Sequence, residues 1–276
     1  MSNCSFNVYF KYTACPLLVV TSFASLIQNL LFCGIVWFDK ALHRRSMILI
    51  VNLSVSGIIY SLTVPFFEFV HVYFYPVWPF GKLGTNLQNT AWIFSLILTF
   101  MTVTCITTER YLVTVRTGFY RAYVTSSSLG WIVFIIWIYS LAWTIIISLN
   151  FSPAFEYRYV WNVPRTPYYI FLGIHLILPL AIIAVLYQRI LNYTRKSRRD
   201  VSLIGNQTIS TEVRLTKTVG LVIGCLYGIW IPVVLIEAVY SFDFCDCVIK
   251  QIDTVGVILT AIDGFLVPIL YFLSHS

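Results

Sequence analysis

Long apolar runs separated by short polar stretches dominate the chain. Seven of these runs are long enough to cross the roughly 30 Å hydrocarbon core of a bilayer. In lipid such runs must be helical, because every backbone polar group has to be hydrogen-bonded within the protein. The pattern therefore predicts an all-α membrane protein built as a seven-transmembrane helix bundle. The expected spans are Pro16–Phe38, Met47–Val72, Thr85–Val113, Ser128–Leu149, Pro167–Tyr193, Val213–Tyr240 and Val248–Leu273.

Composition agrees with this pattern. Hydrophobic residues make up 59% of the 276 residues and charged residues only 11%, far from the balance of a soluble globular chain. A single soluble core could not bury so much apolar surface, so lipid must solvate much of it. The absence of a basic soluble face also excludes a nucleic-acid partner.

The basic residues predict the orientation. Because cytoplasmic loops carry an excess of Lys and Arg, we expect residues 1–15 outside, a seven-transmembrane domain over 16–273, and a very short cytoplasmic end at 274–276. No cleavable signal peptide is expected. The loops assigned to the inner side hold Lys40, Arg44, Arg45, Arg110, Arg116, Arg121, Arg189, Arg195, Lys196, Arg198, Arg199, Arg214 and Lys217, and the outer side has Lys11, Lys82, Arg158, Arg165 and Lys250.

Two glycosylation sequons fall on the predicted outer side, at Asn3 and Asn150, which fits this topology. Three more begin at Asn52, Asn192 and Asn206. Because they lie in a span or on the inner side, we expect none of these three to be used.

A charged triplet, Glu109-Arg110-Tyr111, lies at the inner end of the third span. Charged side chains near hydrocarbon are costly and usually functional. The alternative is an interfacial arginine that extends its head group to water, but that leaves the adjacent acid and tyrosine unexplained. We therefore interpret the triplet as the contact for a cytoplasmic signalling partner.

Across almost its whole length the chain resembles the rhodopsin-like (class A) G-protein-coupled receptors. Each short motif is weak alone, but one set occurs in each span in the family's order. The motifs are Asn29, Asn52-Leu53, Trp78-Pro79-Phe80-Gly81, Glu109-Arg110-Tyr111, Trp137, Pro179 with Tyr187, Trp230-Ile231-Pro232 and Pro268-Ile269-Leu270-Tyr271.

The resemblance implies a switch centred on Arg110. In the resting state Glu109 and Glu212, at the inner end of the sixth span, would hold this arginine, and its release would expose it to a heterotrimeric G-protein. Tyr187 and Tyr271 would support the active state, although both could equally be interfacial tyrosines. Prolines inside spans kink helices, so the expected hinges are Pro179, Trp230 with Pro232, and Pro268.

The chain also departs from the family. Gly57 replaces the usual aspartate of the second span, Val267 replaces a polar residue before Pro268, and an acid appears instead at Asp263. A sodium-type site is therefore not expected unless Asp263 supplies its carboxylate, and we interpret Asn29, Asn52 and Asp263 as a polar core. No metal or cofactor is expected.

The cysteines differ as well. Thr85 occupies the third-span position of the family's outer disulfide, and the loop 150–166 has no cysteine, so that disulfide cannot form. A different bridge between the N-terminus and the third outer loop is plausible, and its partners cannot be assigned from sequence. The candidates are Cys4, Cys15, Cys245 and Cys247.

The ligand is constrained mainly by exclusion. No lysine lies within the seventh span, which disfavours retinal, and Trp92 stands where amine receptors carry an aspartate. Thr63-Val64-Pro65 resembles the Thr-x-Pro kink of chemoattractant and related receptors, and Phe272 is also typical of that branch. In these motifs the chain is similar to orphan receptors of the purinergic and chemoattractant branch. The extracellular ligand is left open as a peptide, lipid or small molecule, with the acidic pocket favouring a cation or peptide. The expected pocket residues are Glu68, His71, Gln88, Trp92, His175, Glu237 and Asp253, above Trp230.

Three functions remain in order of preference. The first is a plasma-membrane G-protein-coupled receptor, whose basic segment 195–199 could also contact membrane lipids. The second is a constitutive or silent receptor that acts as a partner or decoy. The third is a seven-span transporter, which would need repeat symmetry and several buried charges. Catalysis is not expected, because paired acids or a His/Cys cluster at one depth are missing.

Overall fold

The computed structural model of the protein describes residues 6–43, 45–75, 77–150, 165–201, 224–233, 235 and 251–264. Within these ranges the chain is helical apart from short connections, and five helices are long and apolar enough to cross a membrane. The labelled elements are α1 (Val8–Phe38), η1 (Lys40–Leu42), α2 (Met47–Phe74), α3 (Gly81–Val115), α4 (Thr117–Tyr123), α5 (Ser126–Asn150), α6 (Arg165–Leu172), η2 (Gly173–Ile177) and α7 (Leu178–Val201).

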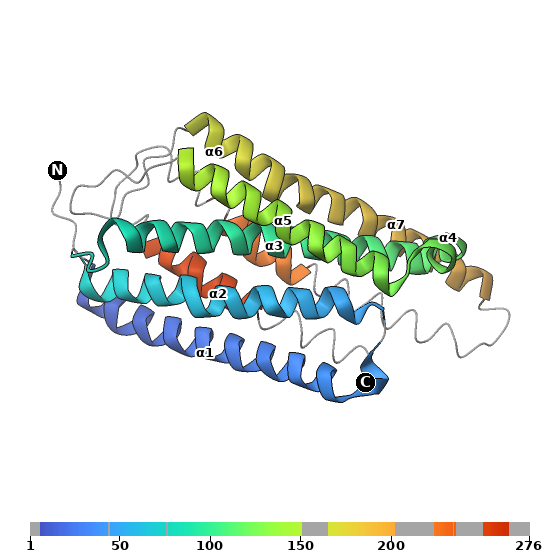
Figure 1. Cartoon of the computed structure of the whole chain (residues 1–276), viewed down its shortest axis with the longest axis horizontal. Helices are drawn as coiled ribbons and strands as arrows, with labels where there is room; N and C mark the ends of the chain where they lie inside the picture. The colour runs from blue at the N-terminus through green and yellow to red at the C-terminus, as the bar shows by residue number, and fades with distance from the viewer. Residues whose placement is uncertain are drawn as a thin grey trace.

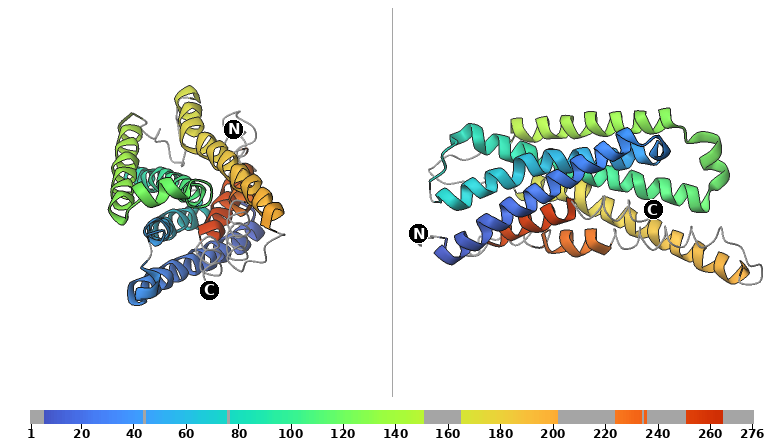
Figure 2. Two further views of the ribbon diagram at one scale, coloured as in Figure 1. Left: turned by 90° about the vertical axis from the view of Figure 1, so that its right-hand side faces the viewer. Right: turned by 90° about the horizontal axis from the view of Figure 1, so that it is seen from below.

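The long helices pack as an elongated bundle (Figure 1). Helix α3 lies at its centre and contacts α2, α5 and α7, whereas α1 packs on α2; the end-on view in Figure 2 shows this arrangement. Two further helical segments, 224–233 and 251–264, pack within the bundle (orange and red). The main core therefore forms around α3 and includes the fully buried Phe100 and Ile97.

Many apolar side chains on the outside of α1 and α5 remain exposed, including Phe23, Leu31, Trp131 and Ile145. In water this surface would be unfavourable, but in a bilayer it meets hydrocarbon of the same polarity. The exposed apolar faces are those expected of a multi-pass membrane protein.

The turn between α2 and α3 explains the motif Trp78-Pro79-Phe80-Gly81. The indole Nε1 of Trp78 donates to the Gly81 carbonyl at 2.8 Å, and Gly81 has a φ of 55°, which an L side chain rarely tolerates. A Cβ at Gly84 would lie 2.1 Å from the Cβ of Phe80. Glycine is therefore required at both positions for this tight turn.

Several helix boundaries differ from the sequence prediction. Helix α1 begins at Val8, eight residues before the expected span, because Asn7 caps it by accepting from the Tyr9 N–H. Helix α4 lies in a stretch expected to be an irregular polar loop. The fifth span is interrupted by the π-helical turn η2, which the apolar pattern did not predict.

Candidate functional site

The C-terminal end of α3 holds a buried charged group. Glu109 and Arg110 are only 3% and 8% exposed, and Arg110 Nε lies 3.5 Å from Glu109 Oε2. The other carboxylate oxygen, Oε1, accepts a 2.9 Å hydrogen bond from the hydroxyl of Tyr120 on α4. Glu109 therefore joins the arginine to the short helix that follows α3.

Tyr120 is suited to donate this bond. Burial, followed by the nearby Glu109 carboxylate, raises the pKa of the Tyr120 hydroxyl to about 12. The hydroxyl consequently keeps its proton throughout the neutral range. A carboxylate that accepts from a phenol gains a charge-assisted hydrogen bond, and this bond fixes how Glu109 faces Arg110.

Arg110 itself is incompletely satisfied within the described part of the chain. Its Nε and Nη2 atoms are buried and have no hydrogen-bond partner there, which is costly for a guanidinium. The neighbouring Tyr111 is half-buried and lies beside Arg116 and Arg189. The triplet therefore presents an acid–arginine pair inward and a tyrosine toward α7.

A second polar group lies in the middle of the bundle. Trp230 Nε1 donates to Asp263 Oδ2 at 3.0 Å, and the Trp230 ring packs edge-on against Phe100 with centroids 4.8 Å apart. Asp263 is 4% exposed, and its Oδ1 has no hydrogen-bond partner among the described residues. The expected hinge tryptophan and the expected polar-core acid thus contact each other.

The structure gives a steric reason for Gly57. Asn29 donates from Nδ2 to the carbonyls of Ser25, at 2.8 Å, and Gly264, at 3.0 Å. A Cβ at Gly57 would lie 2.8 Å from that same Nδ2. A side chain at Gly57 would therefore displace the Asn29 amide from these hydrogen bonds.

Asn52 forms a separate three-helix contact. Its Nδ2 donates to Thr102 Oγ1 on α3 at 2.8 Å, and its Oδ1 accepts from Trp137 Nε1 on α5 at 2.7 Å. Asn52 is only 5% exposed, so both hydrogen bonds lie inside the bundle. The three residues fix α2, α3 and α5 at one level.

The expected ligand residues on α2 gather at the opposite end of the bundle from Arg110. Glu68 is 1% exposed, and its Oε1 accepts from the hydroxyl of Thr254 at 2.6 Å. The ring nitrogen Nδ1 of the buried His71 lies 3.7 Å from the same oxygen. We call Glu68, His71 and Thr254 the Glu68 cluster; it joins α2 to the segment 251–264.

Three other expected pocket residues lie in described helices. Gln88 is buried in α3 and its Oε1 has no hydrogen-bond partner within the described ranges. Trp92 and Asp253 are half-buried. Trp92 packs against the apolar cluster that includes Leu18 and Val64. Of the expected pocket residues, the structure places Glu68 and His71 side by side.

His175 is a correction. It was expected to face a ligand cavity, but it is 0% exposed inside η2. Its Nε2 lies 2.9 Å from the Tyr139 hydroxyl and its Nδ1 lies 3.0 Å from the Phe171 carbonyl, and the Trp143 ring packs on it. Because both nitrogens have partners, His175 is a core contact between η2 and α5.

Cys15 is also a correction. It was considered for a disulfide, but its thiol is free and is buried among Phe6, Val72 and Tyr75. Thr85, at the family's disulfide position, is buried and donates to the Gly81 carbonyl at 3.1 Å. Cys15 therefore lies on the buried face of α1.

Some expected residues lie outside the described ranges, and their roles stay predictions. The switch acid Glu212, the residues Pro268 and Tyr271, and the pocket residue Glu237 belong to this set. Asn150 is the last residue of α5. The sequon at Asn3 and the cysteines Cys4, Cys245 and Cys247 are likewise not described.

The hinge prolines are described in part. Pro179 lies in α7 directly after η2, and Pro232 lies near the end of the helical segment 224–233. Tyr187 is half-buried and packs against the main core. The π-helical turn before Pro179 is a further irregularity of a kind that often marks functional positions.

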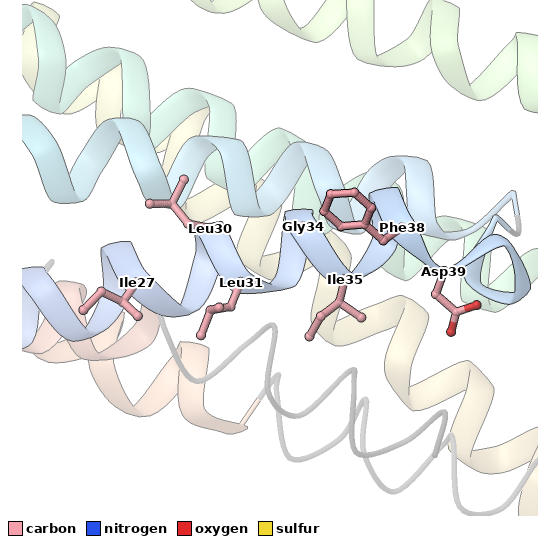
Figure 3. Close-up of a pocket in the computed structure, with 7 residues that line it drawn as sticks. All are labelled: Ile27, Leu30, Leu31, Gly34, Ile35, Phe38 and Asp39. Carbon is pink, nitrogen blue, oxygen red and sulfur yellow. The ribbon is translucent and has the colours of Figure 1, made fainter.

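A groove on α1 is unrelated to these residues (Figure 3). Its lining is apolar except for one acid at its end, and it contains none of the expected ligand residues. In a membrane such a surface faces lipid chains. The groove is lined by Ile27, Leu30, Leu31, Gly34, Ile35, Phe38 and Asp39.

Comparison with known proteins identifies the family. Residues 28–271 match the 7 transmembrane receptor (rhodopsin family). The chain is 25% identical over 260 residues to "Rhodopsin, GQ-coupled" of Mizuhopecten yessoensis, covering 86% of this chain and 52% of that protein. It is 22% identical to melanopsin of Homo sapiens (96% and 59%) and 24% identical to the alpha-1A adrenergic receptor of Rattus norvegicus (88% and 62%).

The chain spans between about half and three fifths of the length of these relatives. By name they are a rhodopsin, a melanopsin and an adrenergic receptor, so they do not single out the purinergic and chemoattractant branch. The match confirms the predicted seven-span fold and replaces the transporter alternative with a family of receptors. The chain belongs to the rhodopsin family of seven-transmembrane receptors.

Proposed function

We propose that this protein is a plasma-membrane receptor that couples an extracellular ligand to a heterotrimeric G-protein. The observation that supports it most is the buried Glu109–Arg110 pair, held on its second oxygen by Tyr120. An arginine whose buried Nε and Nη2 atoms lack hydrogen-bond partners among the described residues has donors available for a new partner. Arg110 lies at the end of α3, the central helix, which contacts α2, α4, α5 and α7. A movement of α3 at this end can therefore be passed to those helices.

The proposed mechanism is a shift between two packings. In the resting one, Glu109 and the sequence-predicted partner Glu212 hold Arg110. Ligand binding near the Glu68 cluster would move the segment 251–264, and Asp263 on that segment is bonded to Trp230. Pro232 and Pro179 would let the sixth and fifth spans pivot, with Tyr187 and Tyr271 supporting the active packing. A ligand acts only through its different affinity for the two packings.

The partner surface includes α4. Phe119 and Tyr123 are 53% and 68% exposed, and their rings lie 4.8 Å apart. No residue of α4 is buried, although Tyr120 reaches Glu109. We propose that this aromatic edge, with the basic segment 195–199, docks a G-protein. Because one relative is named as Gq-coupled, Gq is the first pathway to assay.

The ligand class follows from charge. Glu68 is a buried acid on the proposed outer side, and within the described residues it lies 3.7 Å from the ring nitrogen of His71. We therefore propose a cationic or peptide ligand, and we propose that the receptor belongs to the purinergic and chemoattractant branch. We do not propose retinal as the ligand, although two relatives are opsins. Retinal is held by a Schiff base to a lysine, and the predicted seventh span has no lysine after Lys250 at its outer edge.

The test is basal and ligand-stimulated G-protein activation in cells, with surface expression measured in parallel. Arg110→Ala should abolish the signal, and Glu212→Ala should raise the basal signal by releasing Arg110. A signal that does not depend on Arg110 at normal surface expression would refute coupling through this site. A protein that reaches the surface yet gives no signal in any pathway would favour the silent-receptor alternative, to which the altered position Gly57 also points.

A further inference from the structure

The start of the chain packs back onto the end of α2. Phe6 is only 3% exposed, and its ring centroid lies 4.6 Å from that of Tyr75 and 5.8 Å from that of His71. It also stacks on Phe10 at 5.6 Å. A phenylalanine ring buried to this extent against three aromatic rings marks a specific contact.

Local sequence positions Phe6 for this contact. Asn7 caps α1 by accepting from the Tyr9 N–H at 3.1 Å, which fixes the direction in which the chain enters the helix. A hydrophobic residue just before an N-cap that packs on the first turn is a recurring way to set this angle, and Phe6 packs on Phe10 in this manner. The aromatic ring is therefore directed back toward α2.

A charged side chain provides a second attachment. Lys11 Nζ donates to the carbonyls of Tyr73, at 3.3 Å, and Tyr75, at 3.1 Å. These carbonyls belong to the last turn of α2 and the residue after it, where helical acceptors lack partners. Lysine at a helix C-terminus also complements the helix dipole. Phe6 and Lys11 thus fasten one short segment at two points.

The segment covers the proposed ligand residues. Phe6 packs against His71, and His71 in turn lies beside Glu68, which is 1% exposed. As it stands, the Glu68 cluster is closed to solvent on this side. A ligand that contacts Glu68 from this side can do so only after Phe6 leaves.

We propose that residues 6–11 form a lid, held shut by Phe6 and Lys11, over the Glu68 cluster. The gating of a ligand and the extracellular position of the lid both rest on the proposed receptor function. The lid itself is a property of the fold. It predicts that opening exposes what lies beneath, including the thiol of Cys15, which is 7% exposed and packs in the same cluster as Phe6 and Tyr75.

Cys15 is therefore a native reporter. Intact cells expressing the full chain would be treated with an uncharged, membrane-impermeant polyethylene glycol maleimide, and the labelling rate of Cys15 obtained by subtracting the same variant carrying Cys15→Ser. Phe6→Ala should raise this rate by at least about tenfold, because removing a buried ring lowers the cost of local opening. Lys11→Met should raise it less. Tyr9→Ala is the matched control, since that ring is 80% exposed on the same segment, and it should leave the rate unchanged.

Equal Cys15 labelling in the wild type, Phe6→Ala and Lys11→Met would overturn the lid, as would a rise in Tyr9→Ala of the same size. If Phe6→Ala does not reach the surface, Lys11→Met decides alone. G-protein signalling measured in the same cells separates the two proposals. If Phe6→Ala or Lys11→Met speeds labelling of Cys15 but no variant gives a G-protein signal, the lid is supported and the receptor function is rejected. If the cells give a signal but labelling does not change, the receptor function is supported and the lid is rejected.

Discussion

Replacing Tyr120 with phenylalanine is the sharpest test of the switch. The change removes one hydroxyl and therefore one hydrogen bond, the 2.9 Å bond to Glu109 Oε1, while the ring that packs beside α3 remains. Without it, the Glu109 carboxylate is no longer fixed facing Arg110, and α4 loses its polar link to α3. We expect the resting packing to be destabilised relative to the active one.

The expected size follows from the chemistry of the bond. Hydrogen bonds to charged groups contribute about 1.5–3 kcal/mol when buried. Tyr120 is only half-buried, so about 1–1.5 kcal/mol is appropriate, which is roughly a five- to tenfold change in a two-state equilibrium. If the active packing is a minor state of about 1%, Tyr120→Phe should raise basal G-protein signal several-fold.

The assay is basal signal per receptor at the cell surface. Tyr12→Phe makes the same chemical change at a side chain that is 77% exposed on α1 and does not belong to the proposed partner surface, and it should have no effect. In a Glu109→Gln background the effect of Tyr120→Phe should shrink, as a double-mutant cycle requires. A fall in basal signal would refute the reasoning, because it would mean that Tyr120 competes with Arg110 for the carboxylate. An equal rise in Tyr12→Phe would refute it as well.

Three further predictions concern the rest of the structure. Gly57→Asp should reduce surface expression, since its Cβ would lie 2.8 Å from Asn29 Nδ2, whereas Gly34→Ala has open space around its Cβ and should be neutral; normal expression of Gly57→Asp would contradict the steric argument. Asn52→Ala should lower the melting temperature of the purified protein by removing contacts to two helices, at a cost of about 2–3 kcal/mol, and an unchanged melting temperature would show that this contact is dispensable. Because the pKa of Tyr120 is raised to about 12, its bond contributes stability that is fully present below the ordinary tyrosine pKa of about 10 and is lost as pH rises through about 12. Ultraviolet titration of wild type against Tyr120→Phe should show one tyrosine ionising late, and ionisation near pH 10 would contradict the assignment.

The spans were predictable because a bilayer imposes a length and an apolar composition on each helix. The first two turns of α1, before Pro16, could not be predicted in this way, because Lys11 and Thr13 interrupt the apolar run there. They remain helical because Asn7 caps them and Lys11 reaches the carbonyls at the end of α2. Helix α4 was missed for a related reason: it buries no residue, so it has no apolar face for the pattern to reveal.

The site was predictable where neighbours in sequence are neighbours in space. Glu109 and Arg110 adjoin in the chain, but Tyr120 is 11 residues away on another helix, and a tyrosine in a polar loop carries no signal of that contact. His175 was misplaced because depth along a span does not determine the face. The π-helical turn η2 inserts an extra residue per turn and changes which side chains face the core, here directing His175 to Tyr139.

The final prediction concerns Asp263, the core acid on the segment 251–264. Asp263 accepts from Trp230 Nε1 through Oδ2, while Oδ1 is buried without a hydrogen-bond partner in the described part of the chain. A carboxylate with one neutral donor is poorly compensated, but an amide oxygen can accept the same bond without charge. We therefore expect Asp263→Asn to match or exceed the wild type in melting temperature. Asp263→Leu should be lower by several degrees, because leaving the buried Trp230 N–H unpaired costs about 1–3 kcal/mol. If Asp263→Asn were the more damaged of the two, the carboxylate charge itself would be needed, and Asp263 would be the anchor of an ionic contact, not a polar acceptor for the hinge tryptophan.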